Sequence, residues 1–427
     1  MSLHFLPKYS PYSYQKGRLF CEGVDLGELA QKHGTPLYVY SANHILDQFR
    51  SLQEGLKPLP VLICFAVKAC SNISVLKLLV DAGAGMDIVS EGELHRALTA
   101  GVSPQKTVFS GVGKTRTEIS AALTAGILSF NVESEAELDL INEIARKSLS
   151  VAGVKLRFNP DIDAKTHPYI STGLKENKFG LTRKEIERIV KNRRLYSGVR
   201  IEGLSIHIGS QILSARPIDH AFGEAARFFS ELSREIGEGF SRLDLGGGLG
   251  VSYLGEKRVS VDQYCALIKK HFLGKKSGPA QIVLEPGRSL VAESGALLTE
   301  VLYRKSRGRK EFVVVDAGMN DLIRPALYGA THPVVPLDKS KLSGAQAKTD
   351  LVGPVCESSD SFFQNKVFPK KIQAGDCLAL LGSGAYGFSM ASQYNSRPRP
   401  AEVLISDKQS RVIRRRETLE DLIQGET

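Results

Sequence analysis

The chain has 427 residues, of which 42% are hydrophobic and 24% charged, a balance typical of a folded protein with two domains. Its formal net charge is +10, but the basic residues are spread along the chain, which favours a solvated surface over a nucleic-acid site. Attraction of anionic substrates by the excess positive charge is a secondary alternative. No apolar run is long enough to span a membrane, and residues 1–17 lack the apolar core of a signal peptide, so we expect a cytoplasmic protein without membrane partners.

The six cysteines show neither CxxC pairs nor histidines at zinc spacing, which predicts free thiols and no metal site. They are Cys21, Cys64, Cys70, Cys265, Cys356 and Cys377. One dense basic cluster, residues 411–416, lies beside the acidic segment ETLEDL. Nucleic-acid binding through Arg414–Arg416 remains a minor alternative.

From residue 61 onward, short β-branched runs alternate with helical stretches, one run per βα unit. The runs are VLICFAV (61–67), MDIV (86–89), TVFSG (107–111), LSFNV (128–132), VKLRFNP (154–160), IEGLSIHIG (201–209), RLDLGGG (242–248) and QIVLEPG (281–287). Several helical stretches begin with a capping box, at Ser90 and Glu93, Thr115 and Glu118, Ser134 and Glu137, and Thr182 and Glu185. About eight units in roughly 250 residues favour a closed (β/α)₈ barrel over a doubly wound open sheet.

After Ser289 the pattern changes to strands separated by Gly, Pro and polar turns, such as EFVVVDAG, CLALLG and AEVLISD, without matching helices. This predicts a β-sandwich or β-barrel domain. The strand-like segment RLFCEGVDL (18–26) precedes the first barrel helix and is expected to join the β domain. The expected boundaries are 38–288 for the barrel, with 1–37 and 289–427 forming the β domain.

Active sites of such barrels lie at the C-terminal ends of the strands, so the residues at these ends are the candidates. They are Lys68, Ser90, Gly111, Glu133, Asn159 and Pro160, His207–Ser210, Gly246–Gly248, and Glu285 with Arg288. A lysine, a histidine, a glycine triplet and an acid with an arginine on one rim form a constellation, whereas each alone is a weak signal.

Lys68 ends an apolar strand, where desolvation favours the free amine and hence Schiff-base chemistry with an aldehyde; the alternative is a snorkelling surface lysine. The glycine triplet of DLGGGLG leaves backbone amides accessible to a phosphate. A Rossmann motif fails on spacing, because Val251 or Tyr253 stands where the last glycine belongs. GVGKT (111–115) resembles a P-loop, but its first glycine would fall at Val108, within a strand.

Glu285 closes a strand in LEPGR, where a carboxylate could keep a pyridine nitrogen protonated. The alternative is a structural pair between Glu285 and Arg288. His207 in HIGSQ could stack on such a ring, although a single histidine at a strand end is more often a core residue.

The lysine of FAVKA, followed in order by HIGSQ, DLGGGLG, EPGR, IRPALY, CESSD and YG, resembles the fold-type III pyridoxal-phosphate decarboxylases over almost the whole chain. The resemblance is greatest to the branch that acts on meso-2,6-diaminopimelate. It implies an alanine-racemase-like barrel, a β domain completed by an N-terminal strand, pyridoxal 5'-phosphate as cofactor, and a homodimer with shared active sites. The implied reaction is decarboxylation to L-lysine and carbon dioxide, the last step of lysine biosynthesis.

The resemblance also implies roles for individual residues. Lys68 matches the lysine bonded to the cofactor, and Cys356, arriving from the partner subunit, matches the proton donor. The implied cofactor contacts are Lys68, His207, Ser210, Gly246, Gly247, Gly248, Glu285, Pro286, Gly287, Arg288 and Tyr386. The implied substrate contacts are Arg288, Arg324 and Tyr328 to the remote carboxylate, Glu357 to the remote amine, and Tyr386.

Two positions depart from the family pattern, namely Cys70 in place of asparagine and Ser359 in place of glycine; we expect altered packing there and not lost activity. The alternatives on the same fold are an ornithine- or arginine-type decarboxylase, an alanine racemase, and a non-catalytic regulatory relative that binds the cofactor. Racemases of this fold have an arginine where Glu285 stands, and non-catalytic relatives typically lack the lysine or the cysteine. Tyr328, Tyr386, Cys356 and Arg324 also have purely structural alternatives as core or interface residues.

Overall fold

The computed structural model describes residues 6–7, 10–163, 173, 177–275, 278–308 and 310–427. It divides into two compact units. The barrel unit comprises residues 48–250 and 258–289, and the β unit comprises residues 1–47, 251–257 and 290–427.

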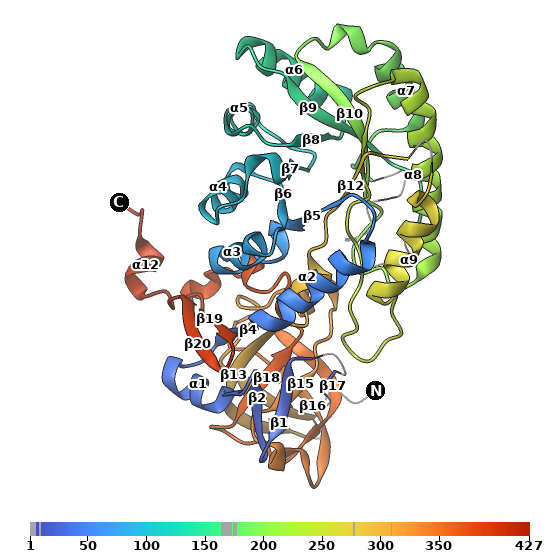
Figure 1. Cartoon of the computed structure of the whole chain (residues 1–427). Coiled ribbons are helices and arrows are strands. Elements are labelled where there is room, and N and C mark those ends of the chain that lie inside the picture. Colours follow the sequence, from blue (N-terminus) through green and yellow to red (C-terminus); the bar gives the residue numbers. More distant parts are fainter. Residues whose placement is uncertain (1–5, 8–9, 164–172, 174–176, 276–277, 309) are drawn as a thin grey trace. The chain divides into compact units, whose positions relative to one another are not determined.

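The barrel unit is a closed ring of parallel strands in the order β10-β11-β12-β5-β6-β7-β8-β9. Helices lie between and outside the strands, with α8 and α9 running along the outer surface (Figure 1). The strands are β5 (Val61–Ala66), β6 (Gly85–Ile88), β7 (Thr107–Phe109), β8 (Ser129–Val132), β9 (Ala152–Phe158), β10 (Val199–Ile206), β11 (Arg242–Asp244) and β12 (Gln281–Leu284). The predicted barrel is confirmed.

The longer helices of this part of the chain are α2 (Ala42–Leu56), α3 (Ile73–Asp81), α4 (Glu91–Thr99), α5 (Arg116–Ala125), α6 (Glu135–Lys147), α7 (Arg183–Lys191), α8 (Ala215–Ile236) and α9 (Val261–Phe272), followed by the single turn α10 (Arg288–Val291). Short 3₁₀ turns are η1 (Val67–Ala69), η2 (Pro104–Lys106) and η4 (Arg193–Leu195).

The predicted capping boxes are complete at two helices and partial at two. At α5 and α7, the threonine accepts from the third helical residue and the glutamate there reaches back to the cap. At α4 and α6, Ser90 and Ser134 accept as predicted, but Glu93 and Glu137 instead bind the amides of Val89 and Glu133, one residue before the cap.

The β unit contains two sheets. Residues of the N-terminal segment form a small antiparallel sheet of β1 (Tyr12–Gln15), β2 (Arg18–Cys21) and β3 (Val24–Asp25), followed by α1 (Leu26–His33). The larger sheet has the order β17-β16-β14-β13-β4-β19-β20, with β18 paired to β13 and β15 paired to β18. Its strands are β4 (Leu37–Ser41), β13 (Gly295–Arg307), β14 (Lys310–Val315), β15 (Val334–Pro336), β16 (Gln346–Val352), β17 (Ser361–Pro369), β18 (Cys377–Leu381), β19 (Ala401–Ser406) and β20 (Gln409–Arg414).

The N-terminal strand that completes the larger sheet is β4, which pairs antiparallel with β13 and parallel with β19. The segment RLFCEGVDL lies in the small sheet of the same unit. Both sheets contribute to one apolar core, in which Leu19 and Leu26 pack with Val39, Leu298 and Val403. The remaining short helices are α11 (Arg324–Tyr328), α12 (Leu419–Ile423), η5 (Lys339–Leu342), η6 (Phe388–Met390) and η7 (Tyr394–Ser396).

Candidate active site

Lys68 lies in η1, the turn that follows β5, where its Nζ is 2.6 Å from Oδ2 of Asp87 on β6. The lysine side chain is 38% exposed, whereas that of Asp87 is fully buried. The sequence predicted a desolvated free amine at Lys68. The structure differs, because the buried Asp87 carboxylate forms an ion pair with the Lys68 side chain. Asp87 Oδ1 is buried with no hydrogen-bond partner among the described residues, which leaves one acceptor available beside the lysine.

Glu285 follows β12 and points into a buried polar network. Its Oε1 accepts from Asn131 Nδ2 at 2.8 Å and from Ser110 Oγ at 3.1 Å. Asn131 also reaches Asp244 Oδ2 at 3.2 Å, and Asp244 forms an ion pair with Lys155 in which both side chains are fully buried. Glu285 thus belongs to a network and does not form the structural pair with Arg288 considered from the sequence; the Arg288 guanidinium donates to Ser210 Oγ at 3.1 Å.

Three acids gather around two lysines in this network. Burial first, and then the nearby carboxylates Asp244 and Asp87, raise the pKa of Glu285 well above its usual value, while Lys68 opposes the shift. A cationic ring nitrogen beside Glu285 would remove this excess of negative charge. The network therefore fits a protonated pyridine ring, which is the group that the cofactor would present.

His207 follows β10, and its Nδ1 accepts from the backbone amide of Gly247 at 3.2 Å, so the proton of the neutral ring lies on Nε2. Burial first, and then the charges of Arg157 and Lys68, lower the pKa of His207 well below its ordinary value. An uncharged, fixed imidazole is suited to lie flat against an aromatic ring.

The glycine triplet after β11 is required by close backbone contacts. A Cβ added at Gly247 would lie 2.1 Å from the Glu285 carbonyl oxygen, and one at Gly248, where φ is +100°, would lie 2.3 Å from that of Gly209. The amides of Gly246 and Gly247 donate to Asp244 and His207, so these two are not available to a phosphate as the sequence suggested. Among the described residues, none accepts a hydrogen bond from the Gly248 amide, which makes it the triplet's candidate donor to a phosphate.

The end of β12 is fastened to its neighbours by backbone hydrogen bonds. The Glu285 amide donates to Gly246 O at 2.7 Å, and Pro286 O accepts from the Ala66 amide at 3.0 Å, two residues before Lys68. The predicted barrel residues Lys68, His207, Ser210, Gly246–Gly248 and Glu285–Arg288 therefore lie on one connected rim, as expected for strand ends.

The other predicted site residues belong to the β unit. Arg324, the first residue of α11, is buried; its Nη1 donates to His332 Nε2 at 2.9 Å, and its guanidinium lies 4.8 Å from the centre of the Tyr253 ring. Tyr386 has a φ of 56°, a conformation uncommon for a bulky side chain that often marks a functional constraint. Tyr328 ends α11 and is half-buried.

Cys356 and Glu357 are exposed within this chain. Cys356 contacts Asn395, and Glu357 accepts from the hydroxyl of Tyr394. Of the two departures from the family pattern, Cys70 is buried, and Ser359 is not among the residues with positive φ, so its side chain causes no backbone strain.

Several functional-site candidates were missed by the sequence reasoning, namely Asp87, Ser110, Asn131, Lys155 and Asp244. Four of them share a signal that could have found them, because a polar residue stands inside an otherwise apolar barrel strand, in MDIV, SFNV, VKLRF and RLDL. Such positions face either the barrel interior or a partner that satisfies them.

Two sequence features turn out to be structural. Lys114 of GVGKT is buried, pairs with Glu137 at 2.6 Å and donates to two backbone carbonyls, so it is not a phosphate-binding lysine. In the basic cluster, Arg414 pairs with buried Glu402, Arg415 with Asp421, and Arg416 donates to Pro36 O at 2.6 Å. These contacts give three arginines of the cluster partners within the β unit.

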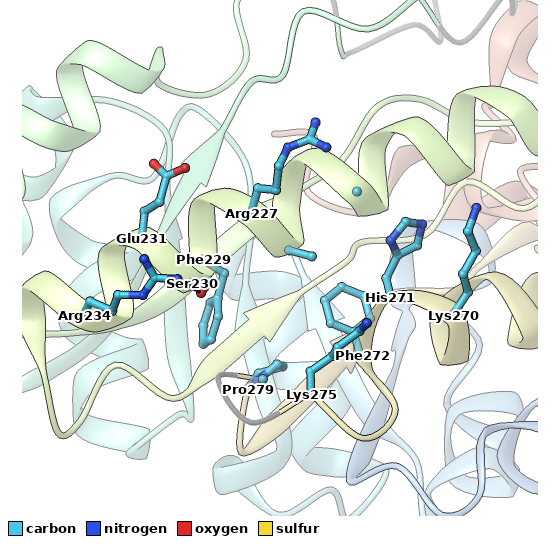
Figure 2. Close-up of a pocket in the computed structure, with 13 residues that line it drawn as sticks. Arg227, Phe229, Ser230, Glu231, Arg234, Lys270, His271, Phe272, Lys275 and Pro279 are labelled. Carbon is cyan, nitrogen blue, oxygen red and sulfur yellow. Dashed lines mark hydrogen bonds between the residues drawn. The ribbon is translucent and has the colours of Figure 1, made fainter.

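A cavity of about 570 Å³ lies between α8, α9 and the segment before β12 (Figure 2). Phe229 and Phe272 line it together with basic side chains, of which Arg227 pairs with Glu224 and Lys270 with Asp219. None of the predicted site residues borders it. Among the helices that the structure describes, none combines the length and apolar character needed to cross a membrane.

The chain is similar to known proteins in both sequence and structure. Residues 42–292 match the family described as pyridoxal-dependent decarboxylase, pyridoxal binding domain. The chain is 43% identical to diaminopimelate decarboxylase of Aquifex aeolicus, with 99% of each chain covered, and 46% identical to that of Pseudomonas aeruginosa, with 97% of this chain and 98% of the relative covered. The chain belongs to the diaminopimelate decarboxylase family.

A solved member of this family has the same fold. The crystal structure of the Helicobacter pylori enzyme complexed with L-lysine superposes with a TM-score of 0.88 at 45% identity, covering 94% of this chain and 98% of the other. The family membership makes this chain a pyridoxal-dependent enzyme whose substrate is a small amino acid.

Proposed function

We propose that the protein decarboxylates meso-2,6-diaminopimelate to L-lysine and carbon dioxide, with pyridoxal 5'-phosphate as cofactor. The observation that carries the proposal is the buried Glu285, placed among carboxylates within electrostatic reach of Lys68. The relatives named diaminopimelate decarboxylase, one of them holding L-lysine, support the choice of substrate and product.

When bound, the cofactor supplies an aldehyde and an electron-withdrawing ring that accepts the electron pair left on the substrate carbon when carbon dioxide departs. In this proposal, Lys68 Nζ holds the cofactor, Glu285 keeps a proton at its ring nitrogen, and His207 covers one face of the ring. Ser210, the Gly248 amide and the backbone near Gly287 hold the phosphate.

Cys356 returns a proton to the carbon that lost the carboxylate, and Tyr386 contacts both cofactor and substrate. Because a general acid must lie within hydrogen-bond reach of the atom that it protonates, the proposal requires Cys356 to arrive at the rim, from the partner subunit of a homodimer. Light scattering of the purified protein should therefore give the mass of two chains.

The choice of substrate depends on the end of the substrate that is remote from the reacting carbon. Arg288, Arg324 and Tyr328 grip the second carboxylate, and Glu357 contacts the second amine. A substrate that lacks this carboxylate would not form these charge-assisted hydrogen bonds, which disfavours ornithine and arginine by several orders of magnitude. The presence of both Lys68 and Cys356 disfavours a non-catalytic relative, and a cytoplasmic location remains a prediction from the sequence.

The test is to incubate the purified protein and cofactor separately with meso-diaminopimelate, L-ornithine and L-arginine and to follow carbon dioxide release. We expect turnover of the first compound alone, with L-lysine as product. Preferential turnover of ornithine would contradict the substrate assignment, and no turnover of any of the three would contradict the enzyme activity.

A further inference from the structure

Two consecutive residues of η7 contact the proposed proton donor and the proposed amine contact. Asn395 Oδ1 accepts from both the Sγ–H and the backbone N–H of Cys356, each at 3.2 Å. The hydroxyl of Tyr394 donates to Glu357 Oε1 at 2.5 Å. Neither residue belongs to the family motifs identified in the sequence.

Asn395 is held in a conformation that presents its amide to the thiol. Its φ of 56° and ψ of 27° are left-handed, which asparagine tolerates better than most residues. The flanking chain is fixed to the β unit, since the Ser392 amide donates to Asn320 O at 2.8 Å and Nη2 of the Arg397 guanidinium donates to Asp316 O at 3.4 Å. The contact between Asn395 and Cys356 is therefore built into the fold of the unit.

We propose that Asn395 is a positioning residue that holds the Cys356 thiol in place, and that Tyr394 does the same for the Glu357 carboxylate, so that the η7 turn fixes the proton donor relative to the contact for the remote amine. The inference rests on the proposed function. In that reaction, the carbon–carbon bond to the carboxylate breaks, and the electron pair stays with the substrate carbon. A carbon–hydrogen bond then forms with the proton of Cys356, and water restores the proton to sulfur.

The chain offers a direct probe of this contact. Within one chain Cys356 is the exposed one of the six cysteines, and in the proposed dimer it lies in an active site that small solutes enter, so alkylation by iodoacetamide, followed on the Cys356 peptide by mass spectrometry, reports on this thiol. The thiolate is the species that reacts, and a thiol that donates to a carbonyl oxygen reacts slowly. Asn395→Gly removes the acceptor without straining the backbone, because glycine readily adopts positive φ.

We expect the holoenzyme of Asn395→Gly to be alkylated about 3-fold faster or more. Asn395→Asp keeps an acceptor and adds a negative charge that opposes the thiolate, so it should react no faster than the unmodified chain. Tyr394→Phe is the matched control, since it leaves the amide in place and should change the rate by less than about 2-fold. Equal rates for Asn395→Gly and the unmodified chain would overturn the proposal.

A second measurement separates positioning from simple loss of structure. Turnover in deuterium oxide by the unmodified enzyme should place deuterium on the lysine product in a single configuration. Asn395→Gly should give a mixture of the two configurations, and it should change kcat more than KM, with kcat lowered. Tyr394→Phe should instead raise KM for meso-diaminopimelate. A single configuration from Asn395→Gly would contradict the role of Asn395, whereas full turnover by Cys356→Ala would contradict the donor role in the proposed function without altering the alkylation result.

Discussion

The acid that faces the proposed ring nitrogen, Glu285, is the residue on which the chemistry depends most. Glu285→Gln keeps the hydrogen bonds with Asn131 and Ser110 possible but removes the charge that would hold a proton on the ring. We expect kcat to fall by about 100-fold or more, because electron withdrawal by the ring weakens when its nitrogen is neutral. Steady-state carbon dioxide release measures this, and retention of kcat within a few-fold would contradict the assignment.

The buried ion pair of Lys155 and Asp244 is linked to Glu285 by Asn131, which contacts both acids. Removing the pair tests its contribution to the stability of the fold. Lys155→Met leaves the buried Asp244 carboxylate without its cation, which should lower the free energy of unfolding by about 3–5 kcal/mol. Adding Asp244→Leu removes that uncompensated charge and should recover much of the loss. Urea denaturation of the two single variants and the double variant tests this, and additive losses would show that the pair is not coupled.

Residue types at strand ends could be predicted because a barrel brings the C-terminal ends of its strands to one rim. Lys68, His207, Glu285 and Arg288 were found this way. Asp87, Asn131 and Asp244 were not, because their partners come from other strands and sequence spacing gives no information on which side chains meet inside the barrel. For Lys68 the position was predicted, but its pairing with a buried acid was not.

At the scale of elements, the alternation of strands and helices was sufficient to predict the barrel, since each unit must cover one buried strand with one helix. The capping pattern predicted where helices begin, although Glu93 and Glu137 bind one amide earlier than a capping box requires. The β unit was less predictable. Its short strands pair across long sequence distances, as β4 does with β13 and β19, and no local pattern specifies such pairing.

Strand pairing in the barrel depends on glycine where two strands approach closely. In β10, a Cβ on Gly203 would lie 1.8 Å from the carbonyl oxygen of Arg242 on β11. Gly203→Ala should therefore push the strands apart and lower the free energy of unfolding by about 3 kcal/mol. Gly113→Ala is the matched control, because no atom lies within 4 Å of its added Cβ, and thermal unfolding should show little change. Equal effects at both positions would contradict this account of the strand pairing.

At the scale of the whole molecule, buried acids make stability depend on pH. Burial raises the pKa of Asp321 to about 7, against the opposing hydrogen bond from the Gly318 amide. Between pH 4 and 7, roughly, the unfolded chain releases this proton and the folded chain keeps it, so stability falls as pH rises. Asp321→Asn removes this pH dependence. The free energy of unfolding of the variant, relative to that of the unmodified chain, should therefore rise by about 2 kcal/mol between pH 5 and pH 8. A difference in unfolding free energy that stays constant over this range would contradict the raised pKa.

The central claim is that Lys68 carries the cofactor. Reduction of the holoenzyme with borohydride makes the bond between a lysine nitrogen and the cofactor permanent, and mass spectrometry of a proteolytic digest then identifies the lysine. The account predicts a phosphopyridoxyl group on the peptide that contains Lys68, and none in a Lys68→Ala variant treated in the same way. A modified peptide from any other lysine would contradict it.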